Sequence, residues 1–439
     1  MATADLSTDP TNIDASTPAA TAPSRLAKLA MLLFAIAIGV GAFLAFDWFH
    51  TAAGQRHVAN LGDTSDSCRE RDPVRHHVFK PNCATVNYWG TDEYKVFTNS
   101  LGFRDENIRE VPLTDPRPRI LMLGNSYTEG KTAWNKTFAG RMATELPQYD
   151  FLNGGVDGYS PSNYVNTARM VLDKGVEIDE VIVFIDNSVV QLEAAFYRDA
   201  NGNGAVTAIP PAEQHSAATA YGRFRKWIGY HLALTYRLLR LGEHAEGTLV
   251  SRGFYHVPGD YFGDPFDMEM SAWSYREVNQ SEPFAAGYAP LGVAGGTARS
   301  LAKMTQLWQE LARRNIPISV VVYPHLAQVV HDTAESREIQ LWRQWCEGKC
   351  KRFVSVAPKF YAARDACSKS QPGCWYSKLF IVGDMHYNAG GNALVAAAVS
   401  ESLAADPPVK VKVAEQSLRP ASNSGIKTGS VAAVVGLGH

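Results

Sequence analysis

Two short segments of the sequence carry residue types that together can activate a nucleophile. Gly124 comes directly after an apolar run, and Ser126 stands two positions later. Asp384 and His386 stand two positions apart near the end of the chain. A serine hydroxyl becomes a good nucleophile when an imidazole takes its proton, and a carboxylate fixes the tautomer of that imidazole. The three residues therefore indicate acyl transfer. Each segment also has a structural interpretation, as a helix N-cap at Ser126 and as a surface loop around His386.

Two further segments supply hydrogen-bond donors of the kind that stabilise an oxyanion. Acyl transfer places negative charge on a carbonyl oxygen, and fixed donors near that oxygen lower the barrier. We expect the backbone N–H groups of Ser126 and Gly155 and the side-chain amide of Asn187 to be these donors. The structural alternatives are a tight turn at Gly155 and a helix N-cap at Asn187.

Alternating strand and helix patterns bring these segments to one edge of a sheet. From residue 119 onward, apolar runs alternate with amphipathic stretches, which predicts a three-layer α/β/α domain with five parallel strands and helices on both faces. In open parallel sheets the functional crevice lies beyond the carboxyl ends of the strands, where the candidate residues stand. The expected strands are 119–123, 150–152, 180–185, 316–323 and 352–356, and the expected helices are 134–146, 162–174, 297–314, 335–346 and 389–403.

The four segments occur in the order of the motif blocks of the SGNH hydrolase family, which residues 95–404 resemble. Gly124-Asn125-Ser126 is similar to the first block, with asparagine where aspartate is usual. The second block is matched by Asn153, Gly155 and Gly158. The resemblance implies the flavodoxin-like SGNH fold for this part of the chain.

The third block departs from the family pattern and the last block follows it. Asn187 alone is retained where the family has Gly-x-Asn-Asp, whereas Asp384 and His386 match the terminal block. The resemblance implies that Ser126 is the nucleophile, His386 the base, Asp384 its orienting acid and Gly155 an oxyanion donor. It implies no metal and no cofactor.

The resemblance also implies a substrate class. The segment 99–105 is similar to that of membrane-anchored SGNH proteins of bacterial envelopes, some of which act on O-acetyl groups of exported polysaccharide. We therefore expect an esterase for O-acyl groups, O-acetyl first, with an acylated glycan as substrate and the envelope polysaccharide machinery as partner. Arg104 in this segment is expected either to hold a substrate carboxylate or to pair with a structural acid. His325 is a candidate for lining the same crevice.

Two other functions stay open. An O-acyltransferase would use the same acyl-enzyme and deliver the acyl group to a sugar hydroxyl instead of water. A catalytically silent polysaccharide-binding module would use the crevice without chemistry, and Asn125 together with the altered third block motivates this hypothesis. A Ser126 hydroxyl far from His386 would support the silent module.

An apolar segment near the N-terminus predicts one transmembrane helix. Residues 29–46 carry no polar side chain and would span about 27 Å as a helix, close to the hydrocarbon thickness of a bilayer. A cleaved secretory signal is the alternative, with Thr51-Ala52-Ala53 as its cleavage site. Arg25 and Lys28 precede the span, so the positive-inside rule predicts a cytoplasmic N-terminus and a periplasmic or extracellular C-terminal domain.

The six cysteines all follow the apolar segment, which favours disulfides in an oxidising compartment. Six cysteines allow 15 connectivities. A zinc site is the alternative, but the spacings are not those of zinc ligands and no histidine pair accompanies them. The close spacings predict the pairs Cys68–Cys83, Cys346–Cys350 and Cys367–Cys374.

Composition and charge bound the remaining organisation. The 439 residues are 46% hydrophobic with a net charge of −2, so a large core is possible and nucleic acid is not an expected partner. Residues 190–290 interrupt the strand and helix alternation as an insertion, and within it residues 221–241 interleave apolar and basic side chains. We expect this segment to form either a cap over the sheet edge or the site, or a helix on the membrane surface with Trp227 and Tyr230 in the interface. The expected parts are a disordered leader 1–24, an anchor 25–49, a connecting region 50–115, the α/β domain 116–404 with an insertion at 190–290, and a disordered tail 405–439.

Overall fold

The computed structural model separates the chain into two compact units. One unit comprises Met1–Ser65 and Ala218–Glu243, and the other comprises Asp66–Ala217 and His244–His439. The expected leader up to residue 23, the tail beyond residue 410 and much of the 190–290 insertion lie outside the described residues. The structure describes residues 24–60, 68–89, 92–198, 204–208, 227–228, 231–232, 234–236, 238–239, 265–278, 283–367, 374–381 and 384–410.

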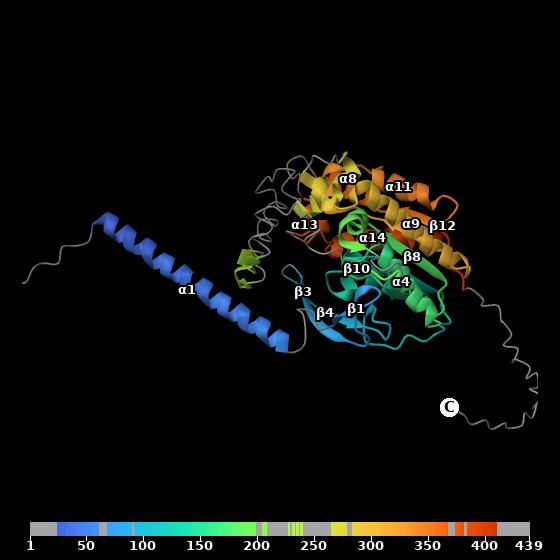
Figure 1. Ribbon diagram of the computed structural model, residues 1–439, viewed down its shortest axis with the longest axis horizontal. Helices are drawn as coiled ribbons and strands as arrows, with labels where there is room; N and C mark the ends of the chain where they lie inside the picture. The colour runs from blue at the N-terminus through green and yellow to red at the C-terminus, as the bar shows by residue number, and fades with distance from the viewer. Residues whose placement is uncertain are drawn as a thin grey trace, which may run out of the picture. The chain divides into compact units, whose positions relative to one another are not determined.

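The first unit contains the long helix α1, Arg25–Asn60, drawn in blue in Figure 1. Its segment Arg25–Ala52 has a mean hydropathy of 2.6, and no residue in the most apolar stretch of this segment is buried. Length and composition of this kind fit a membrane anchor or a signal sequence. The predicted apolar helix is therefore present in the structure.

The second unit is built on one eight-stranded sheet with the strand order β12-β11-β8-β6-β7-β5-β4-β3. Its first five strands in this order are parallel neighbours, which confirms the five predicted parallel strands. Counted along the chain they have the order 2-1-3-4-5, which is the flavodoxin-like arrangement. These strands are β6 (Arg119–Leu123), β7 (Asp150–Asn153), β8 (Glu180–Ile185), β11 (Ile318–Val322) and β12 (Cys350–Ser355).

Three antiparallel strands extend the sheet beyond the five that the alternation predicts. Strands β3 (Ala84–Trp89) and β4 (Asp92–Thr98) pair with each other, and β4 pairs with the short β5 (Arg104–Asp105). Strand β5 in turn pairs with β7 through Arg104 and Asn153. The segment expected as a connecting region therefore covers the open edge of β7. Two separate hairpins are β1 (Arg69–Asp72) with β2 (His76–Phe79), and β9 (Tyr197–Arg198) with β10 (Thr207–Ala208).

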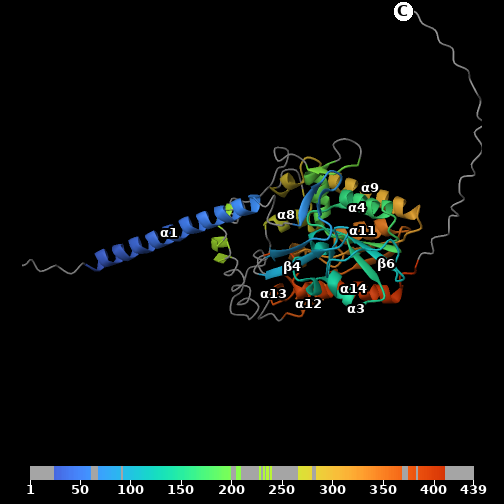
Figure 2. The same ribbon diagram turned by 90° about the horizontal axis from the view of Figure 1, so that it is seen from below.

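Helices cover both faces of the sheet, as Figure 2 shows for α4, α9 and α11 on one side and α3, α12 and α14 on the other. The first group is α4 (Pro161–Asp173), α5 (Ser188–Gln191), α9 (Gly292–Ala312) and α11 (Arg337–Cys346). The second group is α3 (Phe138–Glu145), α10 (Leu326–His331), α12 (Ala357–Asp365), α13 (Tyr376–Leu379) and α14 (Ala389–Ala405). The predicted three-layer α/β/α architecture is confirmed.

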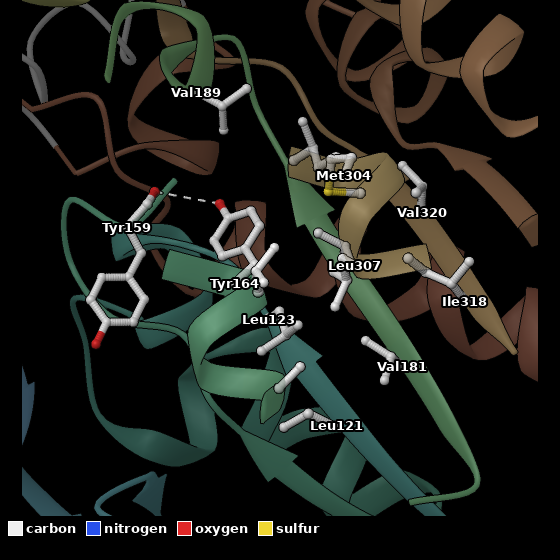
Figure 3. Packing of buried hydrophobic residues seen from close by; sticks show 14 of the residues in the cluster. Leu121, Leu123, Tyr159, Tyr164, Val181, Val189, Met304, Leu307, Ile318 and Val320 are labelled. Carbon is white, nitrogen blue, oxygen red and sulfur yellow. Dashed lines mark hydrogen bonds between the residues drawn. The ribbon is translucent and has the colours of Figure 1, made fainter. Parts of the chain in front are cut away.

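The central strands bury both of their faces, which explains their largely apolar sequences. In β6, Leu121 and Leu123 belong to the core beneath α4 and α9, whereas Ile120 and Met122 belong to the core beneath α3 and α14. Figure 3 shows the first of these cores, where Met304 and Leu307 of α9 meet the strands. Side chains that alternate between two cores fix the register of each strand, because a slip by one residue would exchange the faces.

The three predicted disulfides are all present. They join Cys68 to Cys83, Cys346 to Cys350 and Cys367 to Cys374. Because this pairing uses all six cysteines of the sequence, none is left to ligate zinc.

Candidate active site

The turn from β6 into the short helix α2, Ser126–Glu129, positions the candidate nucleophile. A Cβ atom at Gly124 would lie 2.0 Å from the Thr128 hydroxyl oxygen, so that only glycine lets the helix begin this close to the strand. Asn125 caps α2, since its Oδ1 accepts from the backbone N–H of Tyr127 at 3.2 Å. Ser126 is then the first residue of α2 and remains 8% exposed.

A tight turn before α14 positions the other two candidate residues. The backbone N–H of Asp384 donates to the carbonyl of Ile381 at 2.9 Å, and the N–H of Ile381 donates back to the carbonyl of His386 at 2.9 Å. Asn388 caps α14 by accepting from the N–H of Gly390 at 2.8 Å. The turn is thus fixed at both ends.

Ser126, His386 and Asp384 are joined in one continuous line of hydrogen bonds. Nε2 of His386 lies 2.8 Å from Oγ of Ser126, and Nδ1 of His386 lies 2.5 Å from Oδ1 of Asp384. The same carboxylate oxygen accepts the backbone N–H of His386 at 2.8 Å. A carboxylate at Nδ1 favours the tautomer with the proton on that nitrogen, which leaves Nε2 to accept the serine proton. The arrangement can activate a hydroxyl for attack on a carbonyl carbon.

Tyr127 connects the two halves of this constellation. Its hydroxyl donates to the carbonyl of Met385 at 2.6 Å, and its ring centroid lies 4.8 Å from that of His386. Burial raises the pKa of Tyr127 well above its usual range, so the phenol stays neutral and keeps donating. The residues next to Ser126 and His386 thereby hold the two segments together.

The three expected oxyanion donors differ in their surroundings. The backbone N–H of Ser126 is at the first position of α2, where such groups have no partner within the helix. The N–H of Gly155 donates to Oδ1 of Asn153 at 3.1 Å, and the amide of Asn187 donates to Oγ of Ser271 at 2.7 Å. Donation from Gly155 to a substrate oxygen would therefore replace or share an existing bond, whereas the amide of Asn187 has a second N–H besides the one that Ser271 accepts.

The second candidate segment packs directly on α2. A Cβ atom at Gly155 would lie 2.5 Å from Cβ of Thr128 and 2.8 Å from the backbone nitrogen of Glu129. Asn153 strengthens this contact, because its amide donates to the carbonyl of Thr128 at 2.8 Å. The glycine is required by close approach to the helix that carries Ser126.

Four alternating charges surround the end of α2. The Glu129 carboxylate accepts from Arg69 at 2.6 Å and from Lys131 at 3.0 Å, and Lys131 also contacts Asp157 at 2.8 Å. Partial burial opposes ionisation of Asp157, but the Lys131 ammonium and the Arg69 guanidinium overcome it and hold the pKa of Asp157 below its usual range. With its side chain 42% exposed, Asp157 presents negative charge beside Gly155.

A second buried cluster lies behind Asn125. His325 contacts Asp267 of α8 (Pro265–Tyr275) through Nδ1 at 2.6 Å and Asp186 through Nε2 at 3.3 Å. The Asn125 amide donates to Asp186 at 2.7 Å. Burial alone would lower the pKa of His325, but Asp186 and Asp267 overcome it and raise the pKa to about 10. An imidazolium between two carboxylates thus fastens the residue that precedes Ser126.

Sequence reasoning identified part of this cluster. His325 was expected at the crevice because it follows a core strand, and Asp186 stands in the altered third segment. Asp267 was missed, since it lies in the insertion, where the strand and helix alternation stops. Tyr127 was missed because a tyrosine at a helix start has a common structural interpretation as core.

Arg104 lies buried against the loop that follows α2. Its guanidinium donates to the backbone carbonyls of Glu129 at 2.8 Å and Thr132 at 2.5 Å, and to that of Gly130. It is 1% exposed. Arg104 therefore fixes the loop that follows α2.

The second unit is thus a flavodoxin-like α/β domain with hydrogen-bonded Ser126, His386 and Asp384 beyond the carboxyl ends of its parallel strands. No protein-family model matches the chain, and no curated protein matches it. The chain is similar to a solved acylhydrolase from Bacteroides fragilis (10% identity, TM-score 0.31, covering 66% of this chain and 90% of that one). It is also similar to a member of the lipolytic G-D-S-L family from Veillonella parvula (12% identity, TM-score 0.32, covering 65% of this chain and 98% of that one). A third similar structure is a GDSL-like lipase from Bacteroides thetaiotaomicron (8% identity, TM-score 0.30, covering 65% of this chain and 88% of that one). Likenesses this distant assign neither activity nor substrate.

Proposed function

We propose that this protein is a serine esterase that hydrolyses O-acyl esters, O-acetyl esters of an envelope or exported polysaccharide in the first instance. The observation that carries the proposal is the line of hydrogen bonds from Ser126 through His386 to Asp384, with 2.8 Å between hydroxyl and imidazole. A hydroxyl at this distance from a carboxylate-oriented imidazole is the arrangement that general-base activation needs.

The first half of the reaction forms an acyl-enzyme. Oγ of Ser126 attacks the ester carbonyl carbon while Nε2 of His386 takes the hydroxyl proton, and the carbonyl oxygen becomes an oxyanion. Asp384 stabilises the imidazolium that results. The backbone N–H groups of Ser126 and Gly155, and the amide of Asn187, are the proposed donors to the oxyanion. Collapse breaks the bond to the sugar oxygen, which leaves as an alcohol after receiving the proton from His386.

The second half releases the acid. His386 takes a proton from water, the hydroxide oxygen attacks the acyl carbon, and collapse of the second oxyanion returns the proton to Oγ of Ser126. A sugar hydroxyl in place of water would make the protein an O-acyltransferase by the same steps. The short contact between Ser126 and His386 favours both of these functions over a silent binding module.

We propose that α1 stays attached as a single-pass anchor and that the second unit lies outside the cytoplasm. Three disulfides support an oxidising compartment, and the apolar segment Arg25–Ala52 has the length of a membrane span. This location gives the site access to envelope polysaccharide, whose export machinery is the proposed partner.

The test is intact-mass analysis of the full-length protein in detergent after exposure to a fluorophosphonate, with Ser126→Ala beside it. We expect one adduct on the wild type and none on the variant. Glu401→Gln is the matched control, because this exposed carboxylate contacts only Lys359 among the residues described here. Absence of an adduct on the folded, oxidised wild type would contradict the proposal.

Turnover then separates hydrolysis from transfer. With 4-nitrophenyl acetate as donor, we expect release of acetate that Ser126→Ala abolishes. Addition of an oligosaccharide acceptor should leave acetate as the main product; a rise of acetylated oligosaccharide at the expense of acetate would instead favour the acyltransferase.

A further inference from the structure

A single carboxylate interrupts the exposed surface of the apolar helix α1. Between Arg25 and His50 every residue of the helix is exposed except Asp47, which is fully buried. Thr51, one turn later on the same face, is also buried, and its hydroxyl donates to Asp47 at 3.2 Å. Burying a charged group is costly unless hydrogen bonds satisfy it. The environment of Asp47 therefore has to supply donors.

The donors come from the insertion, in a part that belongs to the same compact unit as α1. Asp47 accepts from the backbone N–H of Leu234 at 2.9 Å and from the N–H and hydroxyl of Thr235 at 2.7 and 2.6 Å. Residues 234–236 are helical and residue 232 is not, so the carboxylate satisfies N–H groups at the start of a helical segment. A residue of the N-terminal helix thus caps a segment nearly two hundred positions later.

Aromatic rings strengthen the same contact. Trp48 stacks on His231 with ring centroids 4.8 Å apart and an interplanar angle of 12°. The ring centroid of Trp227 lies 6.0 Å from that of Trp48 and 5.1 Å from that of His231. Ile228 and Leu232 are buried, whereas Trp227 is 44% exposed. Tryptophan is enriched where hydrocarbon meets water, because its ring is apolar and its N–H is polar.

The outward side of this segment is apolar and its sequence is basic. Leu238 is 56% exposed and Leu239 is 44% exposed, so both present apolar side chains at the surface of this unit. Within 221–241 the sequence has five cations and no acidic residue. These cations are Arg223, Arg225, Lys226, Arg237 and Arg240. Apolar contact together with positive charge is the combination that binds anionic phospholipid surfaces.

We infer that the described residues 227–228, 231–232, 234–236 and 238–239 belong to a membrane-interface element that is fastened to the outer end of α1 by Asp47, with Trp227, Leu238 and Leu239 in contact with phospholipid. The inference rests on the anchor part of the proposed function. It favours an interfacial segment over a cap on the active site for this part of the insertion. It also gives α1 a reason to be retained, since cleavage near Ala53 would remove the carboxylate that caps Leu234 and Thr235.

The test uses the full-length protein in nanodiscs of phosphatidylcholine and phosphatidylglycerol. Because the six native cysteines are paired, Leu238→Cys introduces a single thiol for a nitroxide label. Gln148→Cys, at an exposed position of the other unit, is the matched control. We expect the label at 238 to collide severalfold more with oxygen and less with a water-soluble nickel chelate than the label at 148.

Asp47→Ala tests the fastening. In this variant the label at 238 is expected to move toward the aqueous accessibility of the control, whereas Asp47→Asn, which keeps an acceptor oxygen, is expected to shift it less. A label at 238 with the accessibility of the control in otherwise wild-type protein would overturn the inference. So would a label shielded from both reagents, which would indicate a protein partner, or a membrane-extracted protein whose mass shows that α1 is lost.

The labelling result does not depend on catalysis. If no ester is hydrolysed but the label at 238 is in lipid, the esterase proposal fails and the interface element stands. If a soluble ester is hydrolysed at wild-type rate by Asp47→Ala while the label stays in lipid, the fastening by Asp47 is wrong and the esterase stands.

Discussion

The hydroxyl of Tyr127 donates a 2.6 Å hydrogen bond to the backbone carbonyl of Met385. Tyr127 follows Ser126 and Met385 precedes His386, so this bond joins the immediate neighbours of the two residues proposed to exchange a proton. The chain brings them together from two different elements, the start of α2 and the turn before α14. The distance between Ser126 and His386 therefore depends on a bond outside the proposed catalytic residues.

Tyr127→Phe removes this bond and leaves the ring packing in place. We expect kcat to fall up to about tenfold and the free energy of unfolding to fall by about 1 kcal/mol, because one buried hydrogen bond is lost. KM should change little, since the hydroxyl faces the protein. Steady-state kinetics with 4-nitrophenyl acetate and urea unfolding measure the two effects. An unchanged kcat with reduced stability would show that the bond is structural only.

Asp384→Asn tests the orientation of the imidazole. The amide can present an N–H to Nδ1 of His386, which favours the wrong tautomer, and no charge remains to stabilise the imidazolium. We expect kcat to fall by about 10³- to 10⁴-fold with little loss of stability, because asparagine keeps an oxygen that can accept the backbone N–H of His386. Single-turnover kinetics check the acylation step. A fall smaller than tenfold would show that another group supports His386.

The central sheet was predictable because its strands are buried on both faces. Runs such as 120–123 and 181–185 are apolar without interruption, and the helices between them carry the matching periodicity. The strands β3, β4 and β5 lie in the segment that the sequence predicts only as a connecting region. Their place in the main sheet depends on β5, which has only two residues and therefore leaves no periodic pattern, and whose partner Asn153 is distant in sequence from Arg104.

The residues of the candidate site that stand in local motifs could be predicted from the sequence. The residues that tertiary packing brings to the site could not. Ser126, Asp384 and His386 stand in recognisable turns, and the structure joins them by hydrogen bonds. The partner of Asn187 was not foreseeable, because Ser271 lies in the insertion and no pattern links the two residues. The same holds for Asp267, whose part in the site depends on its contact with His325.

Gly155→Ala tests whether close packing on α2 supports the site. The added Cβ would meet backbone and side-chain atoms of Thr128 and Glu129 at 2.5 to 2.8 Å, so α2 has to move. We expect a loss of stability of about 1 to 3 kcal/mol and a fall in kcat of at least tenfold. Gly175→Ala is the control: its φ of +78° strains an alanine, but no atom lies within 4 Å of the added Cβ. It should lower stability and leave kcat unchanged.

The disulfides differ in the loop that each closes, which predicts an order of stabilisation. Cys68–Cys83 closes a separation of 15 residues and Cys367–Cys374 one of 7. Chain entropy predicts losses of about 3 and about 2 kcal/mol when the pairs are replaced by alanine. Urea unfolding of the two double variants checks this order. The Cys68 variant should also lower kcat, because Arg69 beside it contacts Glu129 of α2; equal activity in both variants would argue against that connection.

His325→Gln tests the buried imidazolium between Asp186 and Asp267. The folded pKa of His325 is raised to about 10, above the value near 6.5 for an unfolded histidine. Its stabilisation is therefore complete below about pH 6.5 and is lost as the pH rises toward 10, at up to about 1.4 kcal/mol per pH unit. In the variant this pH dependence should disappear, and stability near pH 6 should be about 3 to 5 kcal/mol lower because two buried carboxylates lose their counter-charge. Urea unfolding of both proteins between about pH 6 and pH 9.5 gives the difference in slope, in which other titrating groups cancel. Parallel slopes for the two proteins would show that His325 is neutral in the folded state, and that Asp186 is held by Asn125 and Ser188 alone.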